Sequence, residues 1–156
     1  LRISKESFDA LSFNCYALSP DHEKMNHALE ISGLPMIIGE YHFGTVDRGL
    51  AQSLWQVNSQ KERGDAFRYY TENAFAHRGL IGTGWFRWID QNINGRTDGE
   101  NYNCGFIDVT DRPYPYMVDA AIKTAKSLYE IHSGTKTPFH QAPNAVGHSP
   151  IPDLWE

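Results

Sequence analysis

Three short apolar runs, each followed by a stretch with helical spacing, set the strongest limit on how this chain folds. The runs cover residues 8–17, 35–41 and 80–89. After each of them, apolar residues recur at intervals of three and four, which is the period of a helix that buries one face. Alternation of strands with helices is typical of parallel sheets joined by helical crossovers. We therefore expect an α/β fold with parallel strands.

Local signals mark the first two helices. Ser19 followed by Pro20 favours a helix that begins at this point, and Gly33 is expected to close it. Ser59 and Glu62 have the spacing of a capping box, which predicts the start of a second helix. Each helix would then lie between two of the predicted strands.

The last helix is expected to begin near Pro115. After residue 132 the chain contains Gly, Pro and His without any period. We therefore expect residues 1–132 to form one folded portion and residues 133–156 an extended or loosely ordered tail. The helical spacing predicts that the buried side of the last helix consists of Val118, Ala121, Ile122, Ala125 and Leu128.

Two long polar loops, residues 44–58 and 90–113, both follow predicted strands. They would therefore lie at the C-terminal edge of the sheet, where α/β barrels place their chemistry. Three strands make a poor sheet on their own, and a complete barrel needs about 250 residues. We expect a partial (β/α)8 TIM barrel that holds about the last three βα units. Because the first residue is Leu and not Met, we also expect that the given sequence does not begin at the natural start.

Composition excludes several kinds of partner. The formal net charge is −5 and no segment is a run of Lys or Arg, so a nucleic-acid partner is not expected. No apolar stretch approaches the ~20 residues of a membrane helix, so no membrane partner is expected either. The seven His lack metal-ligand spacing and no phosphate-binding loop is present, so we expect neither a metal nor a cofactor. The oligomeric state stays open.

Glu40 is the first candidate for chemistry. It follows Ile37, Ile38 and Gly39 at the end of an apolar run. A carboxylate in such a place costs free energy unless it is paired or functional. A salt bridge across the mouth of the barrel is the structural alternative, and the position favours function.

Three further candidates lie at the end of the third run. Trp85 follows Gly-Thr-Gly, so its ring has room to face a ligand, although a core Trp is as good an interpretation. Asp90 and Gln91 lie where the strand becomes a loop. Their side chains are suited either to bind sugar hydroxyls or to cap the loop.

The polar run 95–103 contains Glu100 and Asn101 and is dense in groups that form paired hydrogen bonds. Sugar recognition uses such groups, and the alternative is a solvated loop whose side chains bond the local backbone. His42 lies two residues beyond Glu40, and a lone His is more often a core or hydrogen-bonding residue than a metal ligand.

Taken together, these motifs resemble a known family. The Asp-Gly-Glu-Asn-Tyr-Asn run at 98–103 is the most specific of them, and the resemblance covers about residues 8–132. The segments 35–44, 47–49, 84–91 and 95–115 resemble the C-terminal part of β-agarases of glycoside hydrolase family 50, and more distantly the family 42 β-galactosidases.

The resemblance implies a (β/α)8 barrel and a retaining mechanism. Glu40 corresponds to the nucleophile at the end of the seventh strand, and Trp85 to a Trp that lines the sugar site at the end of the eighth. Tyr16 is our choice for a residue that hydrogen-bonds the nucleophile. Family members often have Phe in place of Tyr41. The acid/base Glu of the fourth strand has no counterpart here, so the chain alone is expected to be inactive.

The implied function is that of a retaining glycoside hydrolase acting on a β-galactosidic polysaccharide such as agarose. Its partner would be an oligo- or polysaccharide, and a secreted or periplasmic location is expected if the substrate is a polymer. Alternatives are a β-galactosidase-like or carrageenan-active hydrolase, a non-catalytic carbohydrate-binding remnant, and a complete small α/β domain. The residues expected to bind substrate are Tyr16, His42, Trp85, Asp90, Gln91, Glu100 and Asn101.

Overall fold

A computed structural model of the chain describes residues 1–147, so the end of the predicted tail, 148–156, lies outside the described residues. Within residues 1–147, none of the helices is long and apolar enough to cross a membrane. The elements in chain order are α1 (Ser4–Ser7), β1 (Leu11–Asn14), α2 (His22–Ser32), β2 (Met36–Tyr41), β3 (Trp55–Gln56), α3 (Gln60–Phe75), β4 (Leu80–Trp85), α4 (Pro115–His132) and β5 (Val146–Gly147).

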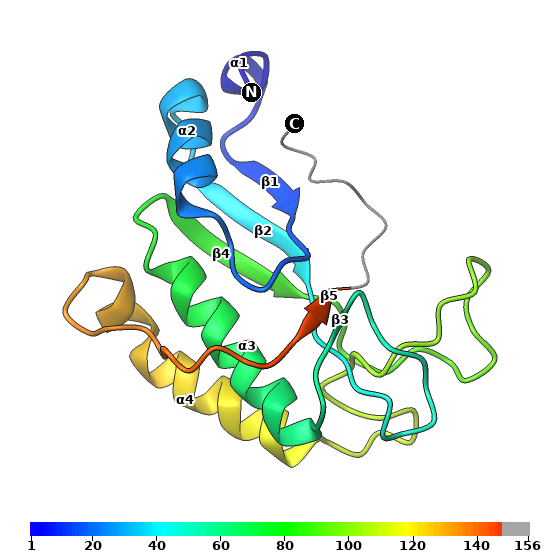
Figure 1. Cartoon of the computed structure of the whole chain (residues 1–156). Helices are drawn as coiled ribbons and strands as arrows, with labels where there is room; N and C mark the ends of the chain where they lie inside the picture. Colours follow the sequence, from blue (N-terminus) through cyan, green and yellow to red (C-terminus); the bar gives the residue numbers. More distant parts are fainter. Residues whose placement is uncertain (148–156) are drawn as a thin grey trace.

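The main sheet consists of three parallel strands in the order β1-β2-β4 (Figure 1). The predicted alternation of strands and helices, and the parallel direction of the strands, are confirmed. A second, much smaller pair forms between β3 and β5, which are antiparallel. Since β5 belongs to the predicted tail, this pair ties the end of the described chain to the loop that follows β2.

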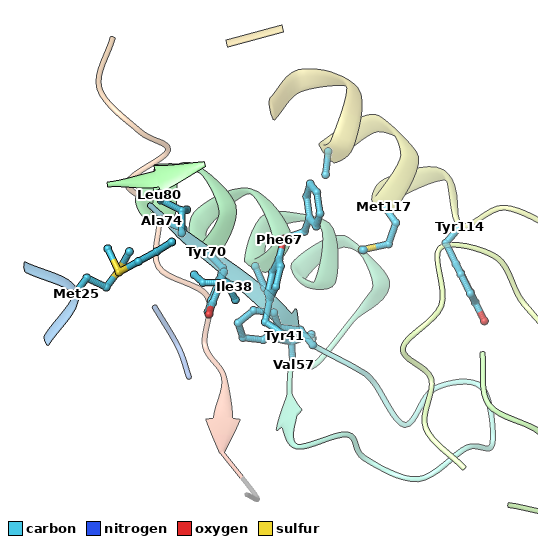
Figure 2. Close-up of a cluster of buried hydrophobic side chains, with 14 of the residues drawn as sticks. Met25, Ile38, Tyr41, Val57, Phe67, Tyr70, Ala74, Leu80, Tyr114 and Met117 are labelled. Carbon is cyan, nitrogen blue, oxygen red and sulfur yellow. The ribbon is translucent and has the colours of Figure 1, made fainter. Parts of the chain in front are cut away.

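One hydrophobic core joins the helices to a single face of the sheet (Figure 2). Its centre is formed by Ile38 of β2 and Leu80 of β4, together with the apolar side of α3. Full burial of one large apolar side chain contributes roughly 1.5–3 kcal/mol. The buried residues of α3 on this side are Ala66, Phe67, Tyr70 and Ala74.

The helix ends follow local chemistry, with one correction. The first long helix does not begin at Ser19, because Asp21 is its N-cap and accepts hydrogen bonds from the backbone N–H groups of Glu23 and Lys24. A carboxylate there satisfies two of the free N–H donors of the first turn, and its negative charge is attracted to the positive end of the helix dipole. Gly33 ends α2 with φ of 66°, a left-handed conformation that Gly adopts without strain.

The predicted start of α3 is confirmed. Ser59 is the N-cap and its hydroxyl accepts a hydrogen bond from the Glu62 N–H at 3.2 Å. The return bond of the capping box is displaced by one residue, because the Glu62 carboxylate accepts from the backbone N–H of Asn58 at 3.0 Å. Both bonds satisfy donors before and at the start of the helix.

The buried face of α4 was predicted wrongly in part, since of its five residues only Ala121, which packs against the core, and Leu128 are half-buried. Val118, Ile122 and Ala125 are exposed, and the face that packs inward carries the small or polar residues Thr124 and Ser127. The remaining buried residues of this helix are Met117, Ala120 and Ile131. Hydrophobic spacing selected the wrong side because α3 supplies a buried polar partner for α4.

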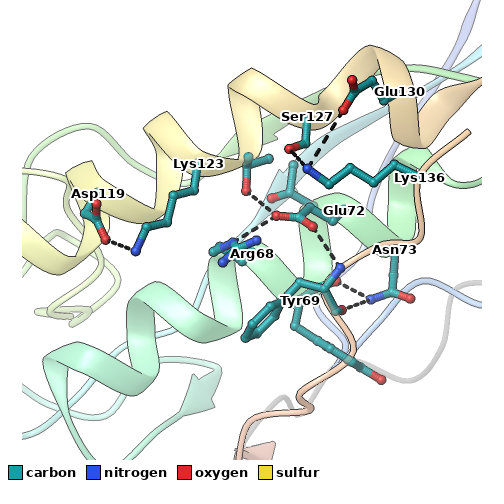
Figure 3. A network of polar contacts seen from close by, with 12 residues as sticks. Arg68, Tyr69, Glu72, Asn73, Asp119, Lys123, Ser127, Glu130 and Lys136 are labelled. Atoms are coloured by element: carbon teal, nitrogen blue, oxygen red, sulfur yellow. Dashed lines mark hydrogen bonds and ion pairs between the residues drawn. The ribbon is translucent and has the colours of Figure 1, made fainter.

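That partner is Glu72, a carboxylate with 1% exposure in α3 (Figure 3). It accepts hydrogen bonds from Arg68 Nε at 2.9 Å, from Thr124 Oγ1 at 3.0 Å and from the backbone N–H of Phe139 at 2.8 Å. Because a buried carboxylate is stable only when it is well bonded, these contacts tie α3, α4 and the tail together. The described part of the tail therefore lies packed on α3.

An extra residue in β2 turns Glu40 away from the core. Met36, Ile38 and Tyr41 are all buried, although strict alternation would place Tyr41 on the face opposite to Met36 and Ile38. The register of β2 shifts against β4 between Ile38 and Tyr41. Such a bulge redirects side chains by one position. Because neighbouring residues of a strand point to opposite faces, Glu40 lies opposite Tyr41, on the face without helices.

The contact between β4 and this bulge generates a prediction. A Cβ added at Gly84 would meet the carbonyl oxygen of Gly39, whereas one added at Gly82 would meet only the Ile37 side chain, at 3.6 Å. We expect Gly84→Ala to lower the stability of the full-length protein by about 1–3 kcal/mol through overpacking and to reduce its activity. Gly82→Ala is the matched control. Equal thermal midpoints for the two variants would contradict this packing.

Candidate functional site

Glu40 and Tyr16 meet at the C-terminal edge of the sheet. The Tyr16 hydroxyl donates a hydrogen bond to Glu40 Oε2 at 2.7 Å, so the expected contact is present. Burial raises the pKa of Tyr16 well above its usual value, and the hydrogen bond to Glu40 and the charge of that carboxylate raise it further. Tyr16 is therefore a neutral donor that leaves Glu40 Oε1 free of this bond.

His42 supports this pair from the loop after β2. It is 2% exposed, and burial lowers its pKa to about 4, so the ring is neutral at neutral pH. Its Nε2 accepts from the Leu54 N–H at 3.1 Å, which leaves the proton on Nδ1 for the Phe86 carbonyl, also at 3.1 Å. The ring packs edge-on against Tyr16 at 4.9 Å. Both ring nitrogens are thus engaged by the protein, which favours the hydrogen-bonding alternative for His42.

The aromatic rings form two groups, one on each side of the sheet. On the side of Glu40, the ring of His42 contacts Tyr16, Phe86 and Tyr102. On the helix side, Trp85 lies edge-on to the ring of Tyr41, with 5.2 Å between centroids. The other helix-side rings in contact with Trp85 are Phe43, Phe67 and Phe106.

Trp85 therefore lies in the core and not beside Glu40. Its indole Nε1 donates to the Cys104 carbonyl at 2.6 Å, and it pairs in register with Tyr41, whose side chain faces the helices. The core alternative that the sequence left open is thus favoured over a stacking platform. The ring that lies on the side of Glu40 is Phe86, which sequence reasoning missed. The available signal was that neighbouring strand residues point to opposite faces, so only one of Trp85 and Phe86 can face Glu40. Choosing between the two requires the register of β4 against β2.

Asp90 lies at the centre of a buried polar cluster, the loop hub, which we define as Asp90, Asn103, Tyr114 and Arg63. Asp90 is 4% exposed. Its carboxylate accepts from Asn103 Nδ2 at 2.9 Å, from the Tyr114 hydroxyl at 2.6 Å and from the Gly105 N–H at 2.7 Å. These bonds occupy both oxygens, so Asp90 holds the loop and does not offer a free acceptor to a sugar.

Arg63 brings a positive charge from α3 into the loop hub. It is completely buried, and its guanidinium donates to the carbonyls of Asn103 and Gly105 at 2.9 and 2.8 Å. The group also lies 4.3 Å from the centre of the Tyr114 ring. Burial lowers the pKa of Arg63, and the negative charge of Asp90 acts in the opposite direction. Each charge thus offsets part of the cost of burying the other.

The loop hub also reaches the loop that follows β2. Gln60 Nε2 donates to Asn103 Oδ1 at 2.7 Å and to Thr45 Oγ1 at 2.8 Å. The backbone N–H of Ala51 donates to the Asn101 carbonyl at 3.2 Å. The two long loops are therefore fixed to each other and to the start of α3, which makes this edge of the sheet a preformed surface.

Gln91, Glu100 and Asn101 lie further out on the same loop. Gln91 is buried, with Nε2 bonded to Glu100 Oε2 at 2.7 Å and Oε1 bonded to the Tyr102 N–H at 2.6 Å. Glu100 retains 28% side-chain exposure and lies 3.5 Å from Arg96. Asn101 is half-buried and donates only a long bond, 3.4 Å, to Ile93. Of the expected sugar ligands on this loop, Glu100 and Asn101 keep polar atoms open to solvent.

Within residues 1–147, no group of three or more His, Cys, Asp or Glu side chains is placed to hold a metal ion. No protein-family model matches the chain. The chain is 40% identical to β-agarase A of Vibrio sp. (strain JT0107) over 128 residues, which are 78% of this chain and 13% of that protein. It therefore spans about an eighth of the length of this curated relative.

Solved structures show the same similarity. An exo-β-agarase matches with a TM-score of 0.80 and 36% identity, over 85% of this chain and 18% of its own. The structure of PfGH50B matches with a TM-score of 0.77 and 40% identity, over 81% of this chain and 18% of its own. Both sequence identities are well above the range in which a structural match shows a shared fold alone.

The loop hub generates a prediction. Replacing Arg63 by Met would leave the carbonyls of Asn103 and Gly105 unpaired and Asp90 without its buried counter-charge, so we expect a loss of several kcal/mol. Arg48 also lies over the Tyr114 ring, at 5.6 Å, but is exposed. Arg48→Met should therefore cost less than about 1 kcal/mol. Thermal unfolding of the two variants of the full-length protein measures the difference, and a stable Arg63→Met variant would contradict the role of the hub.

Proposed function

Since the chain belongs to glycoside hydrolase family 50, we propose that the full-length protein is a retaining glycosidase that cleaves a β-linked galactan such as agarose. The observation that carries the proposal is the placement of Glu40. The bulge in β2 directs its carboxylate to the face opposite the helices, at the C-terminal edge of a parallel sheet. There it accepts a hydrogen bond from the neutral Tyr16 hydroxyl. The agarases among its relatives favour agarose over other galactosides.

In the proposed reaction, Glu40 Oε1 attacks the anomeric carbon of the sugar and the glycosidic bond breaks. The leaving oxygen takes a proton from a second carboxylic acid, and water then hydrolyses the glycosyl ester with that residue as base, so the configuration is retained. Tyr16 would hold the other oxygen of Glu40 in place during both steps. Its raised pKa keeps the proton on the hydroxyl, which serves this purpose.

The second carboxylic acid is proposed to lie in the part of the protein outside this chain. Retaining enzymes place the two carboxyl groups about 5–5.5 Å apart. Asp90 is bonded within the loop hub, and Glu100 is held by Gln91 and lies near Arg96. Both carboxylates are thus engaged by protein groups, so we propose neither of them as the acid. We assign Glu100 and Asn101 to sugar hydroxyls, and Gln91 and Asp90 to holding the loop.

The open surfaces of the chain support a barrel for the whole protein. Parallel sheets are normally covered on both faces, yet here Ile81 is 56% exposed on the face without helices. Both outer strands, β1 and β4, have an unpaired edge in the described chain. On α4, the apolar residues Val118, Ile122 and Tyr129 are exposed. We propose that these surfaces contact the remaining βα units of a (β/α)8 barrel.

The role of Glu40 is tested by Glu40→Gln in the full-length protein. We expect sugar release from agarose to fall by roughly 10³-fold or more, because the amide lacks the nucleophilic carboxylate, while substrate binding is retained. The matched control is Glu130→Gln, since Glu130 is exposed on the outer helix α4. Reducing-sugar assays measure the rates. Turnover that survives in Glu40→Gln would remove Glu40 from this role.

A further inference from the structure

Tyr16, which bonds Glu40, is itself held from three sides. Its hydroxyl donates to Glu40 Oε2 at 2.7 Å, and its ring packs edge-on against His42. Its backbone carbonyl accepts a hydrogen bond from the indole N–H of Trp55 at 2.8 Å. Because Tyr16 lies beyond the end of β1, these contacts, and not strand pairing, fix its ring and its hydroxyl.

The segment that carries Trp55 also holds His42. The N–H of Leu54, the residue before Trp55, donates to His42 Nε2 at 3.1 Å. The Trp55 carbonyl accepts from the Gly44 N–H at 2.9 Å, which fixes the segment to the end of β2. Two neighbouring residues therefore support Tyr16 by separate routes, one through its carbonyl and one through the ring beside it. A shift of this segment would loosen both supports together.

The tail strand β5 lies against the indole of Trp55. In the antiparallel pair of β3 and β5, Trp55 is opposite Gly147 (Figure 1). A Cβ added at Gly147 would lie 2.9 Å from Cζ2 and 3.1 Å from Cε2 of Trp55, and Cε2 is bonded to the nitrogen that donates to Tyr16. Only glycine lets two segments approach so closely without a shift. The tail thus limits where the indole N–H can lie.

Contacts with α3 keep the tail in this place. The backbone N–H of Phe139 donates to Glu72, and its carbonyl accepts from Asn73 Nδ2 at 3.1 Å. The Phe139 ring lies 4.4 Å from the guanidinium carbon of Arg68. Closer to β5, Ala145 packs against the hydrophobic core. The described part of the tail is therefore attached along its length, and its attachment holds β5 beside β3.

We propose that Trp55 is a positioning residue for the nucleophile, and that the tail strand β5 is part of the support of the site. This inference rests on the proposed function, because it needs Glu40 to be the attacking group. Gly147 positions Trp55, and Trp55 positions Tyr16. A displaced Tyr16 leaves Glu40 free to turn from the anomeric carbon, and a small misplacement of a reacting group lowers the rate strongly. Because these contacts end at the nucleophile and not at the sugar, the loss falls on kcat and not on KM.

The test is a double-mutant cycle in the full-length protein, with the hydrolysis of agaro-oligosaccharides of one length as the readout. Trp55→Phe removes the N–H donor and keeps a ring, whereas Gly147→Ala keeps the donor and displaces it. We expect each to lower kcat by about tenfold and to change KM by less than about twofold. In a Tyr16→Phe protein, which already lacks the bond to Glu40, each should lower kcat further by less than about twofold.

The matched control is Val146→Ala in the same strand, because the Val146 side chain is 57% exposed and its pairing with β3 uses backbone atoms. It should leave kcat and KM unchanged. Thermal midpoints of all variants restrict the comparison to temperatures at which each of them is folded.

Four results would overturn the positioning role. They are a wild-type kcat in both variants, losses that add in full to that of Tyr16→Phe, a rise in KM as large as the fall in kcat, and an equal loss in Val146→Ala. Full additivity would mean that Trp55 and Gly147 act independently of the bond between Tyr16 and Glu40. A wild type without any hydrolysis, or a Glu40→Gln protein that keeps it, would instead overturn the proposed function.

Discussion

The extra residue at the end of β2 is the constraint on which the site depends. Tyr41 stacks on Tyr70 with 4.0 Å between ring centroids and hydrogen-bonds Thr71, so the end of the strand is anchored in the core. Without the bulge, strict alternation from Met36 and Ile38 would place Glu40 on their face, among apolar side chains, where an unpaired carboxylate is costly. With it, the same strand buries Tyr41 and directs Glu40 to the opposite face. Packing energy on one side of the strand thus fixes the position of the reactive group on the other.

The loop hub performs the corresponding task for the loops. Side chains next to Glu40 come from segments that have no regular structure of their own, and such segments are usually mobile. Here Arg63 and Asp90 are buried among hydrogen bonds that join both loops to α3. A buried polar network of this kind is stable only when nearly all of its donors and acceptors form hydrogen bonds. It explains why so much of the polar run at 98–103 bonds to protein groups and leaves few atoms for a ligand.

Much of the fold follows from local rules in the sequence, and the site follows only in part. Alternating apolar runs and helical periods are local, so the alternation of strands and helices along the chain, the parallel sheet and the cap at Ser59 were predictable. The buried face of α4 was not, because it is set by Glu72, a residue of another helix. The positions of Trp85 and Asp90 depend on the register shift in β2 and on the loop hub, which no spacing in the sequence reveals. The bond between Tyr16 and Glu40 was expected from family resemblance and not from the residues alone.

The central claim is that Glu40 forms a covalent bond to the sugar. The most direct measurement is to treat the full-length protein with a 2-deoxy-2-fluoro galactoside that carries a good leaving group, then to digest it and locate the label by mass spectrometry. The fluorine slows both the formation and the hydrolysis of the glycosyl ester, and the good leaving group speeds only its formation, so the adduct accumulates. The account predicts the label on Glu40. A label on another carboxylate, or a product with inverted configuration and no adduct, would contradict it.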